Sequence, residues 1–282
     1  MRAGRYLIRA IETDHFRLDG GAMFGSVPRA LWSRYVTPDE HHRIPLVTRV
    51  LLAEGDGRCI LVDTGTGHLW SEKEAAMYGL PAPEIPGVVT ALESAGVNAT
   101  DITDVILTHL HFDHAGGVTM RGESGDPVPT FPNATCHLQR RNLEAAQDPN
   151  ERERKSYLRR HWEPIQGPRL RLYEGEGEIL PDVHVTVSDG HTNGLQVVRF
   201  GEGASAVVYP ADMIPLSTHV RVPWVMGYDL CPRLLMKEKR RLLEVAAQEG
   251  HVLMFEHDSG IAAAQVKSLA GGFERGEVVD IT

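Results

Sequence analysis

Short apolar runs recur along the chain at intervals typical of a protein with many strands. Nine such runs, each rich in β-branched or other apolar residues, lie at residues 6–11, 46–53, 58–63, 104–108, 135–138, 183–187, 196–200, 206–209 and 252–256. Runs of this length and composition are typical of buried β-strands. Residues 54–57, which contain two glycines, join the second run to the third and predict a hairpin turn.

Other segments place apolar side chains at helical spacing. Residues 87–95 and 237–248 have this pattern, and Gly96 and Gly250 then follow them, as is common where helices end. A last helix is expected over residues 261–269. Helices interleaved with strands predict an α/β protein, and the strand pattern predicts one domain, residues 1–282, made of two similar halves.

Three further segments are expected to connect or cover these elements. Residues 121–132 are rich in glycine, proline and charge, and predict a surface loop. Residues 140–162 are helical in composition and strongly charged, which predicts an insertion between the halves. Two roles stay open for it, covering a site or forming the contact of a homodimer. The long apolar loop at residues 213–231 predicts a pocket wall.

Four side chains that bind metals lie within six positions of the loop after the run at 104–108. They are His109, His111, Asp113 and His114. In extended backbone the first two can point the same way, while the last two can face a second point a few ångströms away, so two metals could share the loop. Neutral imidazole and carboxylate suit zinc and its first-row neighbours. Gly116 and Gly117 are expected to let the backbone run close to the ions.

The H-x-H-x-D-H motif of residues 109–114 resembles that of the metallo-β-lactamase superfamily. The resemblance implies a four-layer αββα sandwich of two mixed β-sheets flanked by helices. A member with two metals also needs three later ligands, each at the end of a strand, and His191, Asp212 and His257 follow the runs at 183–187, 206–209 and 252–256. Each of the three alone is a weak signal, but three in the expected order strengthen one another. By similarity, His109, His111 and His191 would hold one metal, and Asp113, His114 and His257 the other, with Asp212 bridging. Asp63 would lie behind the ligands and orient a histidine. A simple turn-capping role for Asp63 is the alternative.

Residues 20–25, with Val27, Pro28, Leu31 and Trp32, resemble the branch of quorum-quenching N-acyl homoserine lactonases. An apolar substrate pocket is expected from residues near this segment and the later loop, namely Met23, Phe24, Trp32, Trp224 and Met226. The alternative is that these side chains only pack on the sheet.

The resemblance implies a dinuclear metal-dependent hydrolase that opens N-acyl homoserine lactones by attack of a metal-bridging hydroxide. Asp113 or Asp212 would carry the proton to the leaving oxygen. Many lactonases have a tyrosine where this chain has Pro215, and His219 or Tyr228 could replace it. Hydrolysis of a phosphotriester, carboxylester or thioester by the same metals is the alternative. A non-catalytic binding member should lack a ligand, and this chain lacks none.

Composition limits the kinds of partner and the cell compartment that are expected for this protein. The net charge of -9 and pI near 5.9 argue against nucleic acid, and the expected partner is a small ester or lactone. The three cysteines are far apart and suggest no disulfide framework, and no export segment or membrane span is evident, so a cytoplasmic protein is expected. Zinc is the first expectation for the metals, although iron, manganese and cobalt accept the same ligands.

Overall fold

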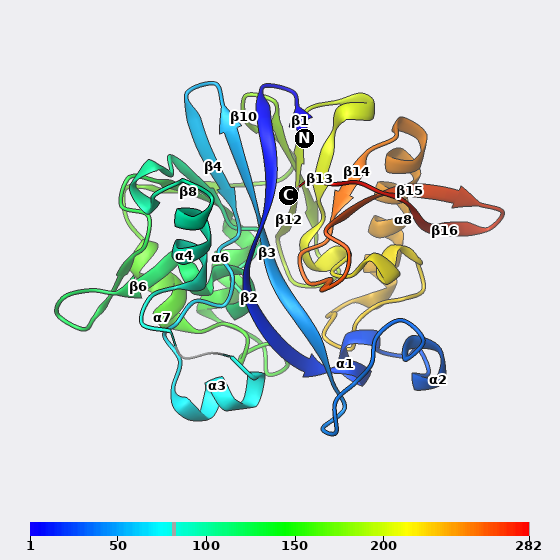
Figure 1. The fold of residues 1–282 in the computed structure, drawn as a ribbon, viewed down its shortest axis with the longest axis horizontal. Helices are drawn as coiled ribbons and strands as arrows, with labels where there is room; N and C mark the ends of the chain where they lie inside the picture. Colours follow the sequence, from blue (N-terminus) through cyan, green and yellow to red (C-terminus); the bar gives the residue numbers. More distant parts are fainter. Residues whose placement is uncertain (81–82, 282) are drawn as a thin grey trace.

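Two seven-stranded β-sheets form the centre of the molecule in the computed structural model, which describes residues 1–80 and 83–281 (Figure 1). The first sheet has an antiparallel part from β1 to β4 and a parallel part from β4 to β9, so it is mixed. Its strands, in spatial order, are β1 (Arg2–Ala3), β2 (Tyr6–Asp19), β3 (Arg43–Gly55), β4 (Arg58–Val62), β5 (Asp104–Ile106), β8 (Thr135–Gln139) and β9 (Leu170–Tyr173).

The second sheet is also mixed, because β13 and β14 pair in parallel while their other neighbours pair antiparallel. Its strands, in spatial order, are β10 (Gly177–Leu180), β11 (Val183–Ser188), β12 (Leu195–Phe200), β13 (Val207–Tyr209), β14 (Val252–Met254), β15 (Ala263–Leu269) and β16 (Gly272–Val278). A separate small hairpin consists of β6 (Thr119–Arg121) and β7 (Pro127–Pro129).

Helices cover both outer faces of the pair of sheets, with α4 and α6 on one side and α8 on the other (Figure 1). The predicted four-layer αββα sandwich is therefore confirmed. In the part of the chain that the structure describes, none of the helices has the length and apolar character needed to cross a membrane. The α-helices are α1 (Gly20–Phe24), α2 (Arg29–Trp32), α3 (Glu72–Tyr78), α4 (Gly87–Ser94), α5 (Phe112–Ala115), α6 (Arg140–Gln147), α7 (Arg159–Trp162) and α8 (Pro232–Glu249). Short 3-10 helices lie at Ala99–Asp101, Gly116–Val118, Glu163–Ile165, Gly203–Ser205, Ala211–Met213 and Ser217–Val220.

Side chains alternate between the two faces of β3, so this one strand contributes to the core on both sides of its sheet. Leu51 and Ala53 are buried between the sheets, in a cluster that includes Tyr6 and Phe200, whose rings meet edge to face at 5.6 Å. Leu52, on the opposite face of β3, belongs to the cluster under α4. Both faces of this strand are apolar because both are covered.

Several elements differ from the predicted ones. Residues 261–269 do not form a helix: most of them form β15, which pairs with β14 and, after a turn at Ala270 and Gly271, with β16. Pairing along both edges outweighs the weak helical preference of this alanine-containing segment. The charged segment at residues 140–162, expected to be helical, contains two short helices, α6 and α7, and residues 121–132, expected to be a loop, contain β7. Strand β2 extends to Asp19 because its pairing with β3 continues to Arg43.

Candidate metal centre

The seven predicted ligands lie together at the ends of strands. The loop after β5 carries His109 and His111, and α5 carries Asp113 and His114. The other three come from the loop between β11 and β12, the 3-10 helix after β13, and the residues after β14, and they are His191, Asp212 and His257. Each of the seven is 7% exposed or less. Buried polar side chains at this density need partners, either one another or bound ions.

One group of ligand atoms comes from His109, His111, His191 and Asp212, and these atoms all lie within 4.8 Å of one another. The Nδ1 atom of His111 lies 3.1 Å from Nε2 of His109 and 3.3 Å from Nε2 of His191. Nitrogens that bind one tetrahedral zinc ion at about 2.0–2.1 Å lie about 3.3 Å apart. The spacing of these imidazoles therefore fits a common cation.

A second group consists of Asp113, His114 and His257, whose ligand atoms also lie within 4.8 Å of one another. The Nε2 atoms of the two histidines are 3.3 Å apart. Asp212 lies between the groups: Oδ2 is 3.1 Å from Nε2 of His191, and Oδ1 is 3.2 Å from Nε2 of His257. One carboxylate in this position can contact a cation on either side.

In four of the five histidines, the ring nitrogen that faces away from the cluster has a partner of its own. His191 Nδ1 donates to Asp229 Oδ1 at 2.8 Å, and His257 Nδ1 donates to the Val47 carbonyl oxygen at 2.9 Å. His109 Nδ1 lies 3.1 Å from the Thr108 hydroxyl. The exception is His111, whose Nε2 atom is buried without a hydrogen-bond partner among the described residues. A fixed partner on one nitrogen decides which nitrogen is left to bind a metal, so the other four histidines are oriented before any ion binds.

Two carboxylates lie beside His114. Its Nδ1 atom is 3.0 Å from Asp63 Oδ2 and 2.9 Å from Glu256 Oε2. Burial and the nearby Asp63 carboxylate raise the pKa of Glu256 to about 7. Asp63 also accepts hydrogen bonds from the backbone and hydroxyl of Thr108, both at 2.7 Å, so it connects the histidine loop to the end of β4.

Outer partners from distant loops were not expected from the sequence. Asp229 lies in the long loop after residue 213, and Glu153 lies between α6 and α7. Glu153 Oε2 is 3.6 Å from His111 Nε2 and accepts a hydrogen bond from Thr192 at 2.8 Å. Neither carboxylate belongs to a motif, so the sequence alone gives no signal for it. Glu256 could have been suspected, because it precedes His257 directly.

The charges within the cluster act on one another strongly. Burial opposes ionisation, but His114 and His191 hold the pKa of Asp212 well below its usual range. Burial lowers the pKa of His191, yet the Asp212 and Asp229 carboxylates outweigh it and raise that pKa to about 10. In the same way, Glu256 and Asp212 raise the pKa of His257 to about 9 against the effect of burial. The carboxylates thus favour positive charge at these nitrogens, which a metal cation supplies as well as a proton does.

The glycines after the motif have a role that was not expected from the sequence. A Cβ atom on Gly116 would lie 2.1 Å from the Thr66 carbonyl oxygen, and one on Gly117 would lie 2.2 Å from the Thr64 carbonyl oxygen. These glycines therefore let the candidate metal-binding loop contact the backbone of residues 64–66. Thr64 N donates to the His114 carbonyl oxygen at 2.7 Å across this contact.

A pocket of about 300 Å³ opens onto the cluster. His111, Asp113, His191, Asp212 and His257 lie at its base. The other lining residues are Leu18, Met23, Tyr78, Phe112, Arg152, Glu153, Lys155, Ser156, Met226, Gly227 and Tyr228. Apolar side chains therefore lie beside the ligands, as a substrate with an acyl or aryl group requires.

The expected pocket residues divide between this pocket and the core beside it. Met23 and Met226 line the pocket. Phe24, Trp32 and Trp224 are not among the described residues that line it. They pack together instead: the Phe24 ring stacks on Trp32 at 5.3 Å and meets Trp224 edge to face at 5.7 Å. The simpler alternative, packing on the sheet, applies to these three aromatic residues.

The two candidates to replace the tyrosine missing at Pro215 differ in position. His219 is buried, donates from Nε2 to the Met23 carbonyl oxygen at 2.9 Å and stacks on Phe24. Burial lowers the pKa of His219 to about 3, and this residue is not among the described residues that line the pocket. Tyr228 lines the pocket, and burial raises the pKa of its hydroxyl, so it stays protonated at neutral pH. Only Tyr228 of these two can donate to a ligand in the pocket.

Comparison with known proteins agrees with this geometry. The family model of the metallo-beta-lactamase superfamily matches residues 43–257. An N-acyl homoserine lactonase of Bacillus cereus is 30% identical over 218 residues, which cover 73% of this chain and 79% of the relative. A probable metal-dependent hydrolase from Staphylococcus aureus has a TM-score of 0.86 and 27% identity, with 99% of this chain and all of that chain covered.

The fold is also that of AidC, a dizinc quorum-quenching lactonase solved with a product bound. The TM-score is 0.79 at 21% identity, with 99% of this chain and 97% of that chain covered. The matched region of the family model contains the histidine motif, the three later ligands and the strands that carry them. The chain therefore belongs to the metallo-β-lactamase superfamily and is a metal-dependent hydrolase.

Proposed function

We propose that this protein opens the ring of N-acyl homoserine lactones with two bound zinc ions. The observation that carries the proposal is the pair of ligand groups at the base of a pocket of about 300 Å³ whose walls include methionine and aromatic side chains. The similarity to an N-acyl homoserine lactonase of Bacillus cereus and to the quorum-quenching lactonase AidC supports the same substrate class. In a lactone with an acyl chain, the ester group would react at the metals and the apolar chain would contact the walls of the pocket.

The ligand assignment is part of the proposal. His109, His111 and His191 would hold one ion, and Asp113, His114 and His257 the other. Asp212 would bridge them, since its two oxygens face histidines of both groups. The nitrogen–nitrogen distances of 3.1 to 3.3 Å and the nitrogen and oxygen donors fit zinc. The similarity to AidC, a dizinc lactonase, favours zinc among the metals that accept these ligands.

Two zinc ions would supply an activated water and a Lewis acid for the carbonyl oxygen. The chain itself would provide orientation and proton transfer. The Asp113 carboxylate lies at the pocket base, 3.8 Å from His257 Nε2, where it could pass a proton to the alkoxide oxygen that leaves the ring. Tyr228 would donate its hydroxyl to the substrate carbonyl, and Met23 and Met226 would contact the acyl chain.

The test combines metal content with turnover. Purified protein should contain two metal ions per chain and should open both N-hexanoyl and N-decanoyl homoserine lactone. His109→Ala and Asp212→Ala should lose metal and turnover together, while His15→Ala, which changes a histidine with a side chain 76% exposed, should keep both.

Two results would overturn parts of the proposal. Protein that holds two metals but opens neither lactone would not be an acyl homoserine lactonase. Turnover of a phosphotriester, an aryl carboxylester or a thioester by that protein would then identify its substrate class. Full turnover by Asp212→Ala would instead exclude the proposed metal-dependent mechanism.

A further inference from the structure

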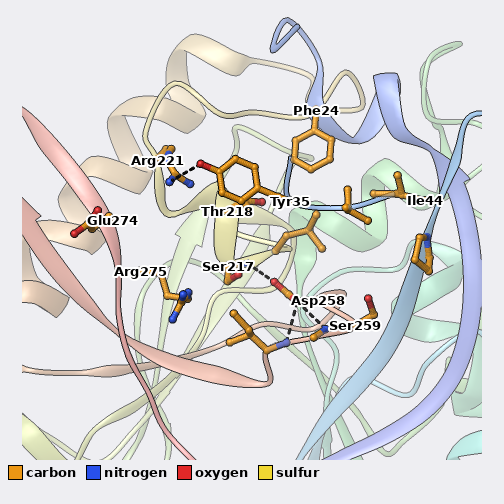
Figure 2. Close-up of a pocket in the computed structure, with 15 residues that line it drawn as sticks. Phe24, Tyr35, Ile44, Ser217, Thr218, Arg221, Asp258, Ser259, Glu274 and Arg275 are labelled. Atoms are coloured by element: carbon orange, nitrogen blue, oxygen red, sulfur yellow. Dashed lines mark hydrogen bonds between the residues drawn. The ribbon is translucent and has the colours of Figure 1, made fainter. Parts of the chain in front are cut away.

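A second cavity, of about 340 Å³, shares no lining residue with the metal pocket among the described residues (Figure 2). One part of its wall is apolar and includes Val36, Leu216 and Ile261. Another part carries two guanidinium groups, those of Arg221 and Arg275. Cavities of this size are at the lower end of small-molecule sites, which run from about 300 to 1,000 Å³.

The wall of this cavity is continuous with the metal centre. His257 N donates to the Pro215 carbonyl oxygen at 3.1 Å, and Ser217 N donates to Asp258 Oδ2 at 2.9 Å. Figure 2 shows Ser217 and Asp258 meeting at the cavity. The two segments that pair here are those that carry Asp212 and His257. A molecule in the cavity would therefore contact the backbone that positions two candidate ligands.

Neither guanidinium of the cavity forms an ion pair with a carboxylate of the described residues. Arg221 stacks over the rings of Tyr35 and Trp224, each with its centroid 5.0 Å away, and donates to the Tyr35 hydroxyl at 3.1 Å. Arg275 donates to the carbonyl oxygen of its neighbour Gly276 at 3.2 Å. Arginine held against aromatic rings keeps its charge and most of its N–H donors for another partner.

The two carboxylates of the cavity already have partners. Asp258 accepts hydrogen bonds from the backbone N–H groups of Ser217, Gly260 and Ile261, each at 2.9 Å. Glu274 lies 3.6 Å from the Lys267 ammonium. Both negative charges are thus stabilised locally, which leaves the positive charge of the two arginines for a guest molecule.

A hydroxyl group at the cavity also lacks a partner. The Oγ1 atom of Thr218 is buried and makes no hydrogen bond to any described residue. A hydroxyl can donate to an anion as well as accept from a donor. The cavity therefore offers two cations and a free hydroxyl beside an apolar wall.

We propose that this cavity binds a medium-chain carboxylic acid in its ionised form. The carboxylate would lie between Arg221 and Arg275, and the alkyl chain would lie against Val36, Leu216 and Ile261. A free fatty acid and an N-acylated amino acid both present this chemistry. The cavity would bind such an acid whatever substrate the metal centre hydrolyses.

The test measures binding to the metal-loaded full-length chain by isothermal titration calorimetry. Decanoate should bind, while decanol, which lacks the charge, and acetate, which lacks the chain, should bind at least tenfold more weakly. N-Octanoyl homoserine, an N-acylated amino acid, is tested beside decanoate, a free fatty acid. The compound that binds more tightly shows which of these two classes the cavity prefers. Trp224 stacks on Arg221, so decanoate should also change tryptophan fluorescence, and Trp224→Phe should remove that change.

Variants separate this cavity from the metal centre. Arg221→Met and Arg275→Gln should each weaken decanoate binding at least tenfold with unchanged metal content, and Arg275 is exposed, so its replacement should not disturb folding. Arg34→Gln, an exposed arginine outside the cavity, should bind decanoate normally. Two results would overturn the proposal. One is decanoate binding that survives both arginine variants but is lost on chelation of the metals. The other is decanol binding as tightly as decanoate.

Discussion

Asp229 and His191 form a carboxylate–imidazole pair 38 residues apart in sequence, with Oδ1 of the first 2.8 Å from Nδ1 of the second. The other oxygen of Asp229 accepts from Met226 N at 2.7 Å, so this one carboxylate also shapes the loop that carries three pocket residues, Met226, Gly227 and Tyr228. A histidine held in this way presents Nε2 toward Asp212 in one orientation.

Replacement of Asp229 by asparagine should therefore weaken metal binding. The amide keeps the size of the side chain but loses the charge that supports the imidazole, and a loss of about 10–100-fold in affinity is expected. Competition with a chelator of known affinity would measure it. Glu163→Gln, which changes an exposed residue paired with Arg159, serves as the control and should bind metal as the wild type does. Equal affinities for Asp229→Asn and wild type would contradict this role.

Tyr228→Phe tests the proposed hydrogen-bond donor of the pocket. Loss of one donor to a developing oxyanion costs about 10²–10³-fold in rate, so kcat should fall by about this factor while KM changes little. Steady-state kinetics with an acyl homoserine lactone would show the split. Tyr173→Phe, which removes a hydroxyl that contacts His137 away from the pocket, should keep wild-type kinetics. A wild-type kcat for Tyr228→Phe would exclude the tyrosine as this donor.

Gly117→Ala should destabilise the fold. The new methyl group would lie 2.2 Å from the Thr64 carbonyl oxygen and 2.9 Å from a Val88 methyl, so the two loops would have to separate. We expect a loss of about 3 kcal/mol or more in the free energy of unfolding, measured with urea. Gly167→Ala is the matched control, because nothing lies within 4 Å of the added Cβ. If both variants unfold at the same urea concentration, the close contact is not rigid.

Lys239 should make stability depend on pH. It is fully buried in α8 and donates to the Trp224 carbonyl oxygen at 2.5 Å, and burial lowers its pKa to about 7 from an ordinary value of 10.5. Between these two values the unfolded chain binds the proton and the folded chain does not, so stability should rise with pH. The contribution of one such group reaches about 1.4 kcal/mol per pH unit.

Lys239→Met should remove this contribution from the pH dependence of the free energy of unfolding. Lys237→Met, an exposed lysine on the same helix, should leave the wild-type slope unchanged. Urea unfolding at several values from pH 7 to 10 would give the three slopes. A slope for Lys239→Met equal to that of the wild type would show that the lysine keeps its ordinary pKa in the folded protein.

The sequence predicted best the candidate metal ligands, which come directly after strands. The motif at residues 109–114 was visible as a local pattern, the three later residues were chosen by resemblance to the family, and the structure brings the seven together. The strands followed from apolar runs, whereas the two-sheet, four-layer arrangement followed from the resemblance. Prediction failed at residues 261–269, because pairing with β14 and β16 decides that segment rather than its own composition.

The sequence by itself determined which side chains could bind metals and which segments would be strands, because both depend on residue type and on neighbours within a few positions. Tertiary structure alone decided the rest: that Asp229 and Glu153 support His191 and His111, that Tyr228 and not His219 faces the pocket, and that Phe24 lies at a second cavity. These relationships join residues from different loops. Loop paths depend on packing between sheets and helices, which no local pattern in the chain specifies.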